Sequence, residues 1–172
     1  MERTKIFTIQ KQQPKTGRKI KMSETIIKAI CYGAGYLCVG LAAIGSVLGT
    51  GCAGEAAIGA WRKCYQQGKT APFLLLAMVG APLSQTIYAM ILMVTMNGKV
   101  NTAPQNWPVY IIIGILCGLA QMFSAIFQGK CAACGSVAFA ESDKGFANYL
   151  MVLGIIETCA IFALVFSFMA MP

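Results

Sequence analysis

The stretch from Phe146 to Met171 limits what this chain can fold into more than any other part. It reads FANYLMVLGIIETCAIFALVFSFMAM, and its only charged residue is Glu157, close to the middle. A helix needs about 20 apolar residues to cross a bilayer, so the stretch predicts a transmembrane helix. A carboxylate at mid-membrane costs about 3 kcal/mol or more. Glu157 is therefore a candidate functional residue, and its partners are expected on other helices.

The remaining charges separate further apolar blocks. Only 12% of the 172 residues are charged, against about 25% in a soluble domain. No charge lies between Lys28 and Glu55, between Lys69 and Lys99, or between Lys99 and Lys130. The pattern predicts an all-α membrane protein with four transmembrane helices, and not a signal peptide followed by a soluble domain. The expected helices are roughly 25–60, 71–96, 109–140 and 146–171.

The first 24 residues have a different composition. Eight of the 14 Lys and Arg residues lie in the first 28 positions, so the net charge of +8 mainly describes this end. Polar residues and Pro14 predict a disordered tail over 1–24, and Met22 is an alternative start. A basic tail can attract nucleic acid or anionic lipid. Nothing else in the chain indicates nucleic acid, so we expect no such partner.

The eight cysteines would indicate disulfides in a small secreted protein. Here seven fall in expected apolar helices, and only Cys64 is expected near a loop. Cys131 and Cys134 form a CxxC pair, but the chain has no His and no second pair, so we expect no metal there. Buried free cysteine packs as a small hydrophobic residue, which is the interpretation we favour.

The chain also repeats itself. Gly40-Leu41-Ala42 recurs as Gly118-Leu119-Ala120, an offset of 78 residues, and Ser46 and Gly51 have Ser124 and Gly129 at the same offset. Gln85-Thr86 in the second block corresponds to Glu157-Thr158 in the fourth. The first block is dense in glycine, including a Gly45–Gly49 GxxxG pair, which favours close packing of helix backbones. The sequence therefore predicts two tandem helical hairpins, 25–98 and 99–172, the second of which carries Glu157.

Few polar side chains are expected mid-span besides Glu157. They are Ser84, Gln85 and Tyr88 in the second helix, Gln121, Ser124 and Gln128 in the third, and Thr158 in the fourth. Ser84 and Tyr88 share a helix face. Pro82 removes a backbone donor, which frees a carbonyl near residue 78 and loosens the turn around Ala81.

This set suits a desolvated cation, which takes several oxygen ligands and one negative charge. Glu157 would supply the charge, and Gln85, Gln128, Ser84 and the Ala81 carbonyl would supply neutral oxygens. Tyr88 would donate its hydroxyl hydrogen to the carboxylate. Each neutral residue also has a plain structural interpretation: interhelical hydrogen bonds for the two glutamines, a bond to its own helix for Ser84, and packing for Tyr88.

Several motifs together resemble a known family, the 16-kDa-type proteolipid of V-type and archaeal-type (V/A) rotary ATPases, which is the c or K component of the rotor ring. The resemblance covers about residues 25–171. It rests on Gly45-Ser46, Gly49, Gly51 and Gly54-Glu55-Ala56 in the first helix, Pro82 to Tyr88 in the second, Phe127-Gln128-Gly129-Lys130 in the third and Ile156-Glu157-Thr158 in the fourth.

The resemblance implies a non-catalytic, ion-translocating subunit of the cell membrane. Its partners would be identical subunits in a ring, a stator subunit with an essential Arg, a central-stalk subunit and the lipid bilayer. In sodium-pumping members the ligand positions correspond to Glu157, Gln85, Gln128, Ser84 and Ala81, with Tyr88 bonded to the carboxylate. Ser84 and Ala81 stand where the sodium type has Thr and Leu. Ser84 keeps the hydroxyl, and a backbone carbonyl ligand tolerates the change to Ala81. No cofactor is implied; the transported ion is Na⁺, with H⁺ as the alternative.

Two other classes of protein remain open. A small secondary transporter or channel with a midplane Glu would work without an ATPase. A structural subunit of a membrane assembly would not depend on Glu157 for transport. In the family, both termini lie outside and the hairpin loops lie in the cytoplasm, which agrees with Arg62, Lys63, Lys69 and Lys144 but not with the basic tail.

Overall fold

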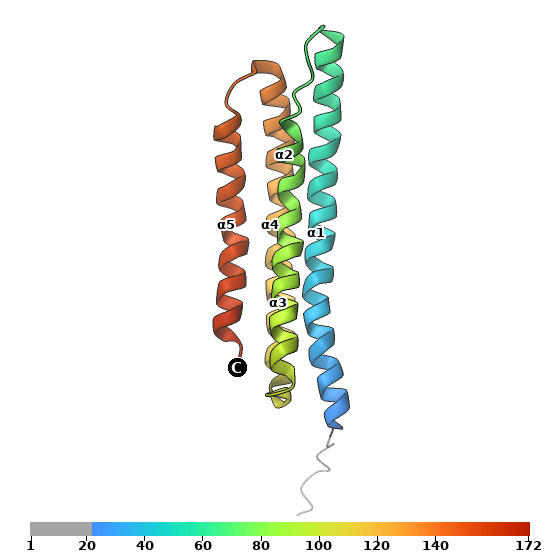
Figure 1. The fold of residues 1–172 in the computed structure, drawn as a ribbon, viewed down its shortest axis with the longest axis vertical. Helices are drawn as coiled ribbons and strands as arrows, with labels where there is room; N and C mark the ends of the chain where they lie inside the picture. Colours follow the sequence, from blue (N-terminus) through green and yellow to red (C-terminus); the bar gives the residue numbers. More distant parts are fainter. Residues whose placement is uncertain (1–21) are drawn as a thin grey trace, which may run out of the picture.

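The computed structural model describes residues 22–172, and every regular element in that range is a helix. The long helices are α1 (Glu24–Gln66), α3 (Ser84–Val100), α4 (Trp107–Ser142) and α5 (Phe146–Ala170). The short elements are α2 (Leu75–Gly80) and two 3₁₀ turns, η1 (Ala81–Leu83) and η2 (Pro104–Asn106). Because α2, η1 and α3 continue one another, four helical rods stand side by side (Figure 1).

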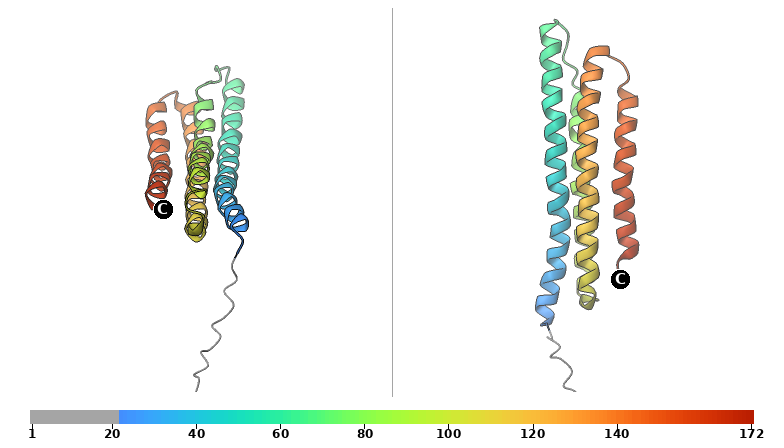
Figure 2. Two further views of the ribbon diagram at one scale, coloured as in Figure 1. Left: turned by 60° about the horizontal axis from the view of Figure 1, so that its bottom comes forward. Right: turned by 180° about the vertical axis from the view of Figure 1, so that it is seen from behind.

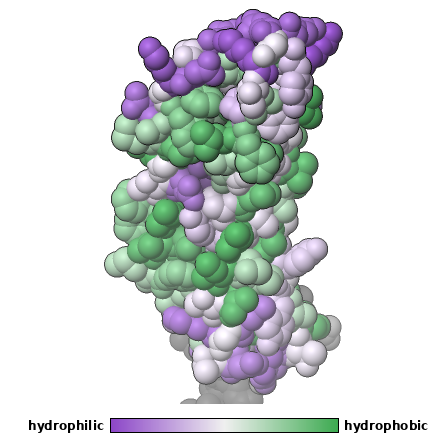
Figure 3. Space-filling model, turned by 45° about the horizontal axis from the view of Figure 1, so that its top comes forward, coloured by the Kyte–Doolittle hydropathy of each residue, from purple (hydrophilic) through white to green (hydrophobic). Residues whose placement is uncertain are grey.

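Each of the four rods is long and apolar enough to cross a membrane. The prediction of an all-α protein with four spanning helices is therefore confirmed. The surface agrees with this arrangement, since a largely apolar band separates two polar ends (Figure 3). The expected tail over 1–24 lies almost entirely outside the described residues.

The rods form two hairpins that open toward the same end. The connections after α1 and after α4 lie at one end of the bundle, and the start of α1, the α3–α4 connection and the C-terminus lie at the other (Figure 1). Helix α4 lies between α1 and α5, with α3 on one side of it (Figure 2). The ion-site candidates of α3, α4 and α5 can therefore meet along one seam.

Glycines hold α1 and α4 close together. A Cβ on Gly129 would collide with the backbone of Gly49, and a Cβ on Gly114 would collide with the backbone of Ala34. The two helices run parallel, because residue numbers rise together along both sides of this contact. The close approach that the glycine pattern predicts is thus present, and it fixes α4 as the platform on which α3 and α5 pack.

The first connection is shorter than expected. We expected a loop over 61–70, but α1 continues to Gln66 and places Cys64 in its last turns, where that side chain is buried. Trp61 Nε1 donates to the Pro72 carbonyl at 2.8 Å, which ties the end of α1 to the start of the next rod. Cys64 thus lies next to the connection, as expected, but in the last turn of α1, where its carbonyl accepts from the backbone N–H of Lys69.

The second rod departs from a regular α-helix where proline predicts it. Three residues around Pro82 form the turn η1, and the rod resumes as α3 at Ser84. Pro82 has no N–H to continue the α-helical ladder, so the chain tightens locally to i→i+3 bonding. The helix is therefore irregular around Ala81 as predicted, but as a tightened 3₁₀ turn and not as a loosened one. The rod begins at Leu75 rather than at 71.

Candidate functional site

Glu157 lies near the middle of α5 and its carboxylate faces the other helices. Tyr88 Oη, on α3, donates to Glu157 Oε1 at 2.6 Å. Gln128 Nε2, on α4, donates to Glu157 Oε2 at 3.3 Å. The carboxylate is partly buried, and within residues 22–172 it forms no salt bridge. Two neutral donors on two other helices therefore hold it in place.

Two buried glutamines continue the network into the bundle. Gln85 and Gln128 are both completely inaccessible to solvent. Gln85 Nε2 donates to Gln128 Oε1 at 2.9 Å and to Ser124 Oγ at 3.2 Å. A buried amide needs such partners because an unpaired one costs about 1–3 kcal/mol. Gln85, at the repeat position of Glu157, thus links the first hairpin to the second.

Neutral oxygens gather at the turn around Pro82. Ser84 Oγ lies 3.1 Å from the Ala81 carbonyl oxygen and 3.3 Å from Gln85 Oε1. In the turn η1, the Ala81 carbonyl accepts the backbone N–H of Ser84 and also the Ser84 hydroxyl. A hydroxyl, a backbone carbonyl and an amide oxygen thus lie within hydrogen-bonding distance of one another.

Helix α4 also donates to the backbone of α5. Gln121 Nε2 donates to the Ala160 carbonyl at 2.9 Å, Ser124 Oγ to that of Ile156 at 3.1 Å, and Gln128 Nε2 to that of Leu153 at 3.1 Å. The three donors lie on one face of α4 because they are spaced i, i+3 and i+7. They fix the position of α5 along α4, and with it the height of Glu157.

The six predicted site residues are joined by one continuous series of hydrogen bonds. Hydrogen bonds connect them in the order Tyr88, Glu157, Gln128, Gln85, Ser84, Ala81. Ser124 was noted only as a mid-span polar residue, yet it contacts both Gln85 and α5; its spacing from Gln128 was the available signal. Thr158, noted beside Glu157, bonds to the Gly154 carbonyl of its own helix and is exposed.

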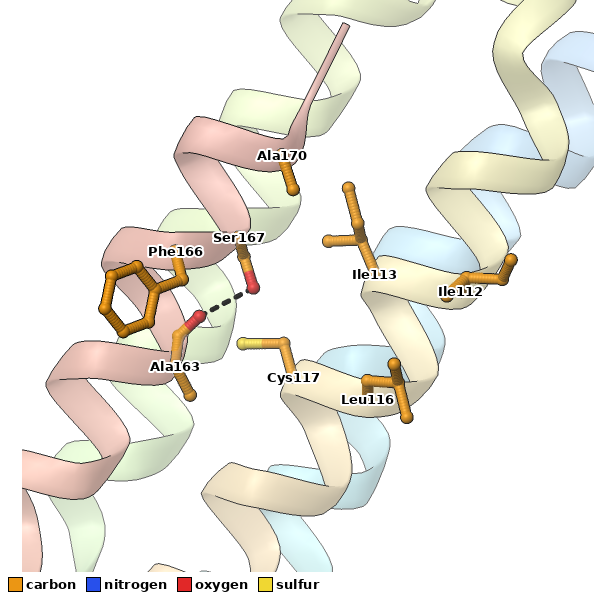
Figure 4. Close-up of a pocket in the computed structure, with 8 residues that line it drawn as sticks. All are labelled: Ile112, Ile113, Leu116, Cys117, Ala163, Phe166, Ser167 and Ala170. Carbon is orange, nitrogen blue, oxygen red and sulfur yellow. Dashed lines mark hydrogen bonds between the residues drawn. The ribbon is translucent and has the colours of Figure 1, made fainter.

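A pocket between α4 and α5 is separate from this network. It has a volume of about 320 Å³ and lies nearer the C-terminal end of α5 (Figure 4). Its polar contact is internal, since Ser167 Oγ donates to the Ala163 carbonyl at 2.7 Å. None of the six site residues lines it. Its lining is Ile112, Ile113, Leu116, Cys117, Ala163, Phe166, Ser167 and Ala170.

Fold and site together define a multi-pass helical membrane protein with one carboxylate held between helices. Residues 111–170, which include most of α4 and all of α5, match the family model for the C subunit of ATP synthase. The match contains Gln128 and Glu157 and stops short of the first hairpin. No curated protein matches the chain significantly.

Proposed function

We propose that this chain is a rotor-ring proteolipid of a V/A-type rotary ATPase in the cell membrane, and that it carries sodium ions at Glu157. The observation that carries the proposal is the series of hydrogen bonds that links the Glu157 carboxylate through Gln128 and Gln85 to the Ser84 hydroxyl and the Ala81 carbonyl. The match of the second hairpin to the C subunit of ATP synthase supports the same role.

The ligand set favours sodium over protons. A sodium ion between Glu157, Gln85, Gln128, Ser84 and the Ala81 carbonyl would meet one negative charge and four neutral oxygens, as a hard cation prefers. Tyr88 would remain bonded to the carboxylate and hold its orientation. A proton needs only the carboxylate, so a proton carrier would not need so many neutral oxygens. The proton remains the alternative cargo.

Transport follows from the charge of the site. With a cation bound, Glu157 is neutralised and α5 can face lipid. Without the cation, the bare carboxylate is disfavoured there and needs a polar partner. In the proposed ring of identical subunits, that partner is the essential Arg of the stator, and a central stalk carries the rotation to or from the ATP-hydrolysing part. The chain itself catalyses no reaction.

One carboxylate per two hairpins sets the transport ratio. Gln85 occupies the acid position of the first hairpin, so each copy in the ring carries one ion where two acidic hairpins would carry two. Fewer ions then cross per turn, which suits pumping against a steep gradient. A measured ion-to-ATP ratio equal to that of rings with one acid per hairpin would contradict this step.

Carbodiimide labelling tests the proposal. The reagent modifies Glu157 when the carboxyl is free, so sodium at constant pH should slow the labelling, followed by mass spectrometry of the α5 peptide. Potassium at equal ionic strength is the control for salt effects, and Glu157→Gln is the control for the labelled position. Labelling that ignores sodium would refute sodium binding and leave protons as the cargo.

A further inference from the structure

The orientation of the Gln85 amide decides whether this side chain offers a cation an oxygen or an N–H group. The two ends of a glutamine amide have nearly the same shape, but one end donates hydrogen bonds and the other accepts them. Gln85 is completely inaccessible to solvent, so neighbouring side chains must fix its orientation. Its Nε2 faces α4, and its Oε1 lies 3.3 Å from Ser84 Oγ, on the side of the turn η1.

Ser124 is the first of two groups on α4 that fix this orientation. Its hydroxyl has a single hydrogen, which it donates to the Ile156 carbonyl of α5 at 3.1 Å. A backbone carbonyl can only accept, so the Ser124 oxygen is left to accept from a neighbour. Gln85 Nε2 lies 3.2 Å from that oxygen and donates to it. With the amide reversed, two oxygens would face each other with no hydrogen between them.

Gln128 is the second group and acts in the same way. Its Nε2 donates to the Leu153 carbonyl at 3.1 Å and to Glu157 Oε2 at 3.3 Å. Its Oε1 is therefore left to accept from Gln85 Nε2, at 2.9 Å. Both hydrogens of the Gln85 amide are thus bonded to α4, and acceptors on α5 decide the direction of both bonds. Gln128 already belongs to the proposed ligand set, whereas Ser124 does not.

We infer that Ser124 is a positioning residue that favours sodium over protons at Glu157. It holds the Gln85 oxygen toward the cation through its bond to Gln85 Nε2, and it does not bind the cation itself. A proton on Glu157 needs no ligand from Gln85, so losing this bond weakens sodium binding and spares proton binding. The inference rests on the proposed function, since it names a residue that sets the ion preference of the same site.

The internal repeat provides a matched control. Ser46 lies 78 residues before Ser124, and it is buried to a similar degree, with 2% of its surface exposed against 8% for Ser124. Its hydroxyl also forms a bond between helices, since it accepts from Thr86 Oγ1 of α3 at 2.8 Å. That bond does not involve the Gln85 amide. Replacing Ser46 by alanine therefore removes a comparable hydrogen bond and leaves the orientation of Gln85 unchanged.

Sodium protection of Glu157 from carbodiimide tests the inference in the full-length chain in detergent. Ser124→Ala should raise the sodium concentration that half-protects Glu157 about three- to tenfold, as the loss of one net hydrogen bond predicts. The pH at which labelling is half-maximal without sodium reports proton binding, and it should stay the same. Ser46→Ala should change neither value.

The variants Ser124→Thr and Ser124→Val provide a second comparison. Their side chains have nearly the same shape, but only threonine has a hydroxyl. A pocket of about 410 Å³ borders Ser124 between α4 and α5 and can hold the added methyl group. Ser124→Thr should keep the sodium affinity of the unmodified chain, and Ser124→Val should weaken it about three- to tenfold. This pair tests the inference even if Ser124→Ala fails to fold.

Equal sodium protection in the unmodified chain, Ser124→Ala and Ser124→Val would overturn the inference and leave sodium binding at Glu157 intact. Equal shifts in the sodium dependence and the pH dependence of labelling would also overturn it, because Ser124 would then act only by holding α5 in place. Labelling of the unmodified chain that ignores sodium would refute the proposed function, and the inference with it.

Discussion

Replacing Tyr88 by phenylalanine probes the bond that holds the Glu157 carboxylate. The substitution removes one hydroxyl and keeps the ring, so α3 should pack as before. The lost bond is short, at 2.6 Å between Tyr88 Oη and Glu157 Oε1. Hydrogen bonds to charged groups contribute about 1.5–3 kcal/mol. Both side chains are only partly buried, so we expect about 1–2 kcal/mol here.

That free energy should appear as weaker sodium binding. A loss of about 1–2 kcal/mol corresponds to a roughly 5- to 30-fold change in an equilibrium constant. The sodium concentration that half-protects Glu157 from carbodiimide should therefore rise about 5- to 30-fold in Tyr88→Phe. The oxygens of Gln85, Gln128 and Ser84 are untouched, so saturating sodium should still protect fully.

Tyr110→Phe is the matched control for this experiment. Tyr110 is a fully buried tyrosine on α4, and its hydroxyl has no hydrogen-bond partner among the described residues. Removing that hydroxyl should leave the half-protecting sodium concentration unchanged. Equal sodium protection in Tyr88→Phe and the unmodified chain, or equal losses in both tyrosine variants, would refute the role we give to Tyr88.

Four further substitutions test the packing of the bundle separately from its ion site. Gly129→Ala should lower the stability by about 1–3 kcal/mol, because the added methyl group overpacks against α1. Gly98 lies in open space, so Gly98→Ala should leave the stability unchanged or raise it by up to about 1 kcal/mol. Thermal unfolding in detergent, followed by circular dichroism, measures both changes. Gln121→Leu removes a hydrogen-bond donor to α5, but it also removes a buried amide oxygen that has no partner in residues 22–172. Because the two effects oppose each other, the stability should change by about 1 kcal/mol or less. Sodium should still protect Glu157 from labelling. Lys63→Ala breaks an exposed ion pair with Glu141, and because solvent-exposed ion pairs contribute little to stability, the unfolding temperature should change only slightly.

A different result would contradict each of these predictions. Unfolding temperatures that fall equally for the two glycine variants would show that the α1–α4 approach is not tight at Gly129. Loss of sodium protection in Gln121→Leu would place that residue among the ligands. A large drop in stability for Lys63→Ala would mean that the two hairpin connections depend on that ion pair.

The helices were predictable because charge and hydropathy in this chain are segregated. Three long charge-free gaps and the final apolar run mark four spans, and the structure has four. The end of α1 was not predictable in the same way. The segment after Trp61 is polar, as a loop would be, but it consists mainly of residues that tolerate a helix. Tertiary contacts such as Trp61 to Pro72 decide where the helix ends.

The sequence predicted which helices carry the site residues and which residues share a face. It did not predict which of them form hydrogen bonds with one another. Helical spacing places Ser84 and Tyr88 on one face, and the repeat aligns Gln85 with Glu157. The partners of Ser124 depend on how α4 is rotated against α3 and α5, which spacing along one helix cannot specify. The turn at Pro82 is an exception, because the missing N–H of proline has a local structural consequence.

Direct sodium binding tests the central claim most simply. Equilibrium dialysis of the purified chain against radioactive sodium at constant pH gives the number of ions bound per 18.3 kDa chain. We predict one sodium ion per chain and none in the Glu157→Gln variant. No saturable binding in the unmodified chain, or equal binding in the variant, would contradict the assignment of Glu157 as the charged ligand of a sodium site.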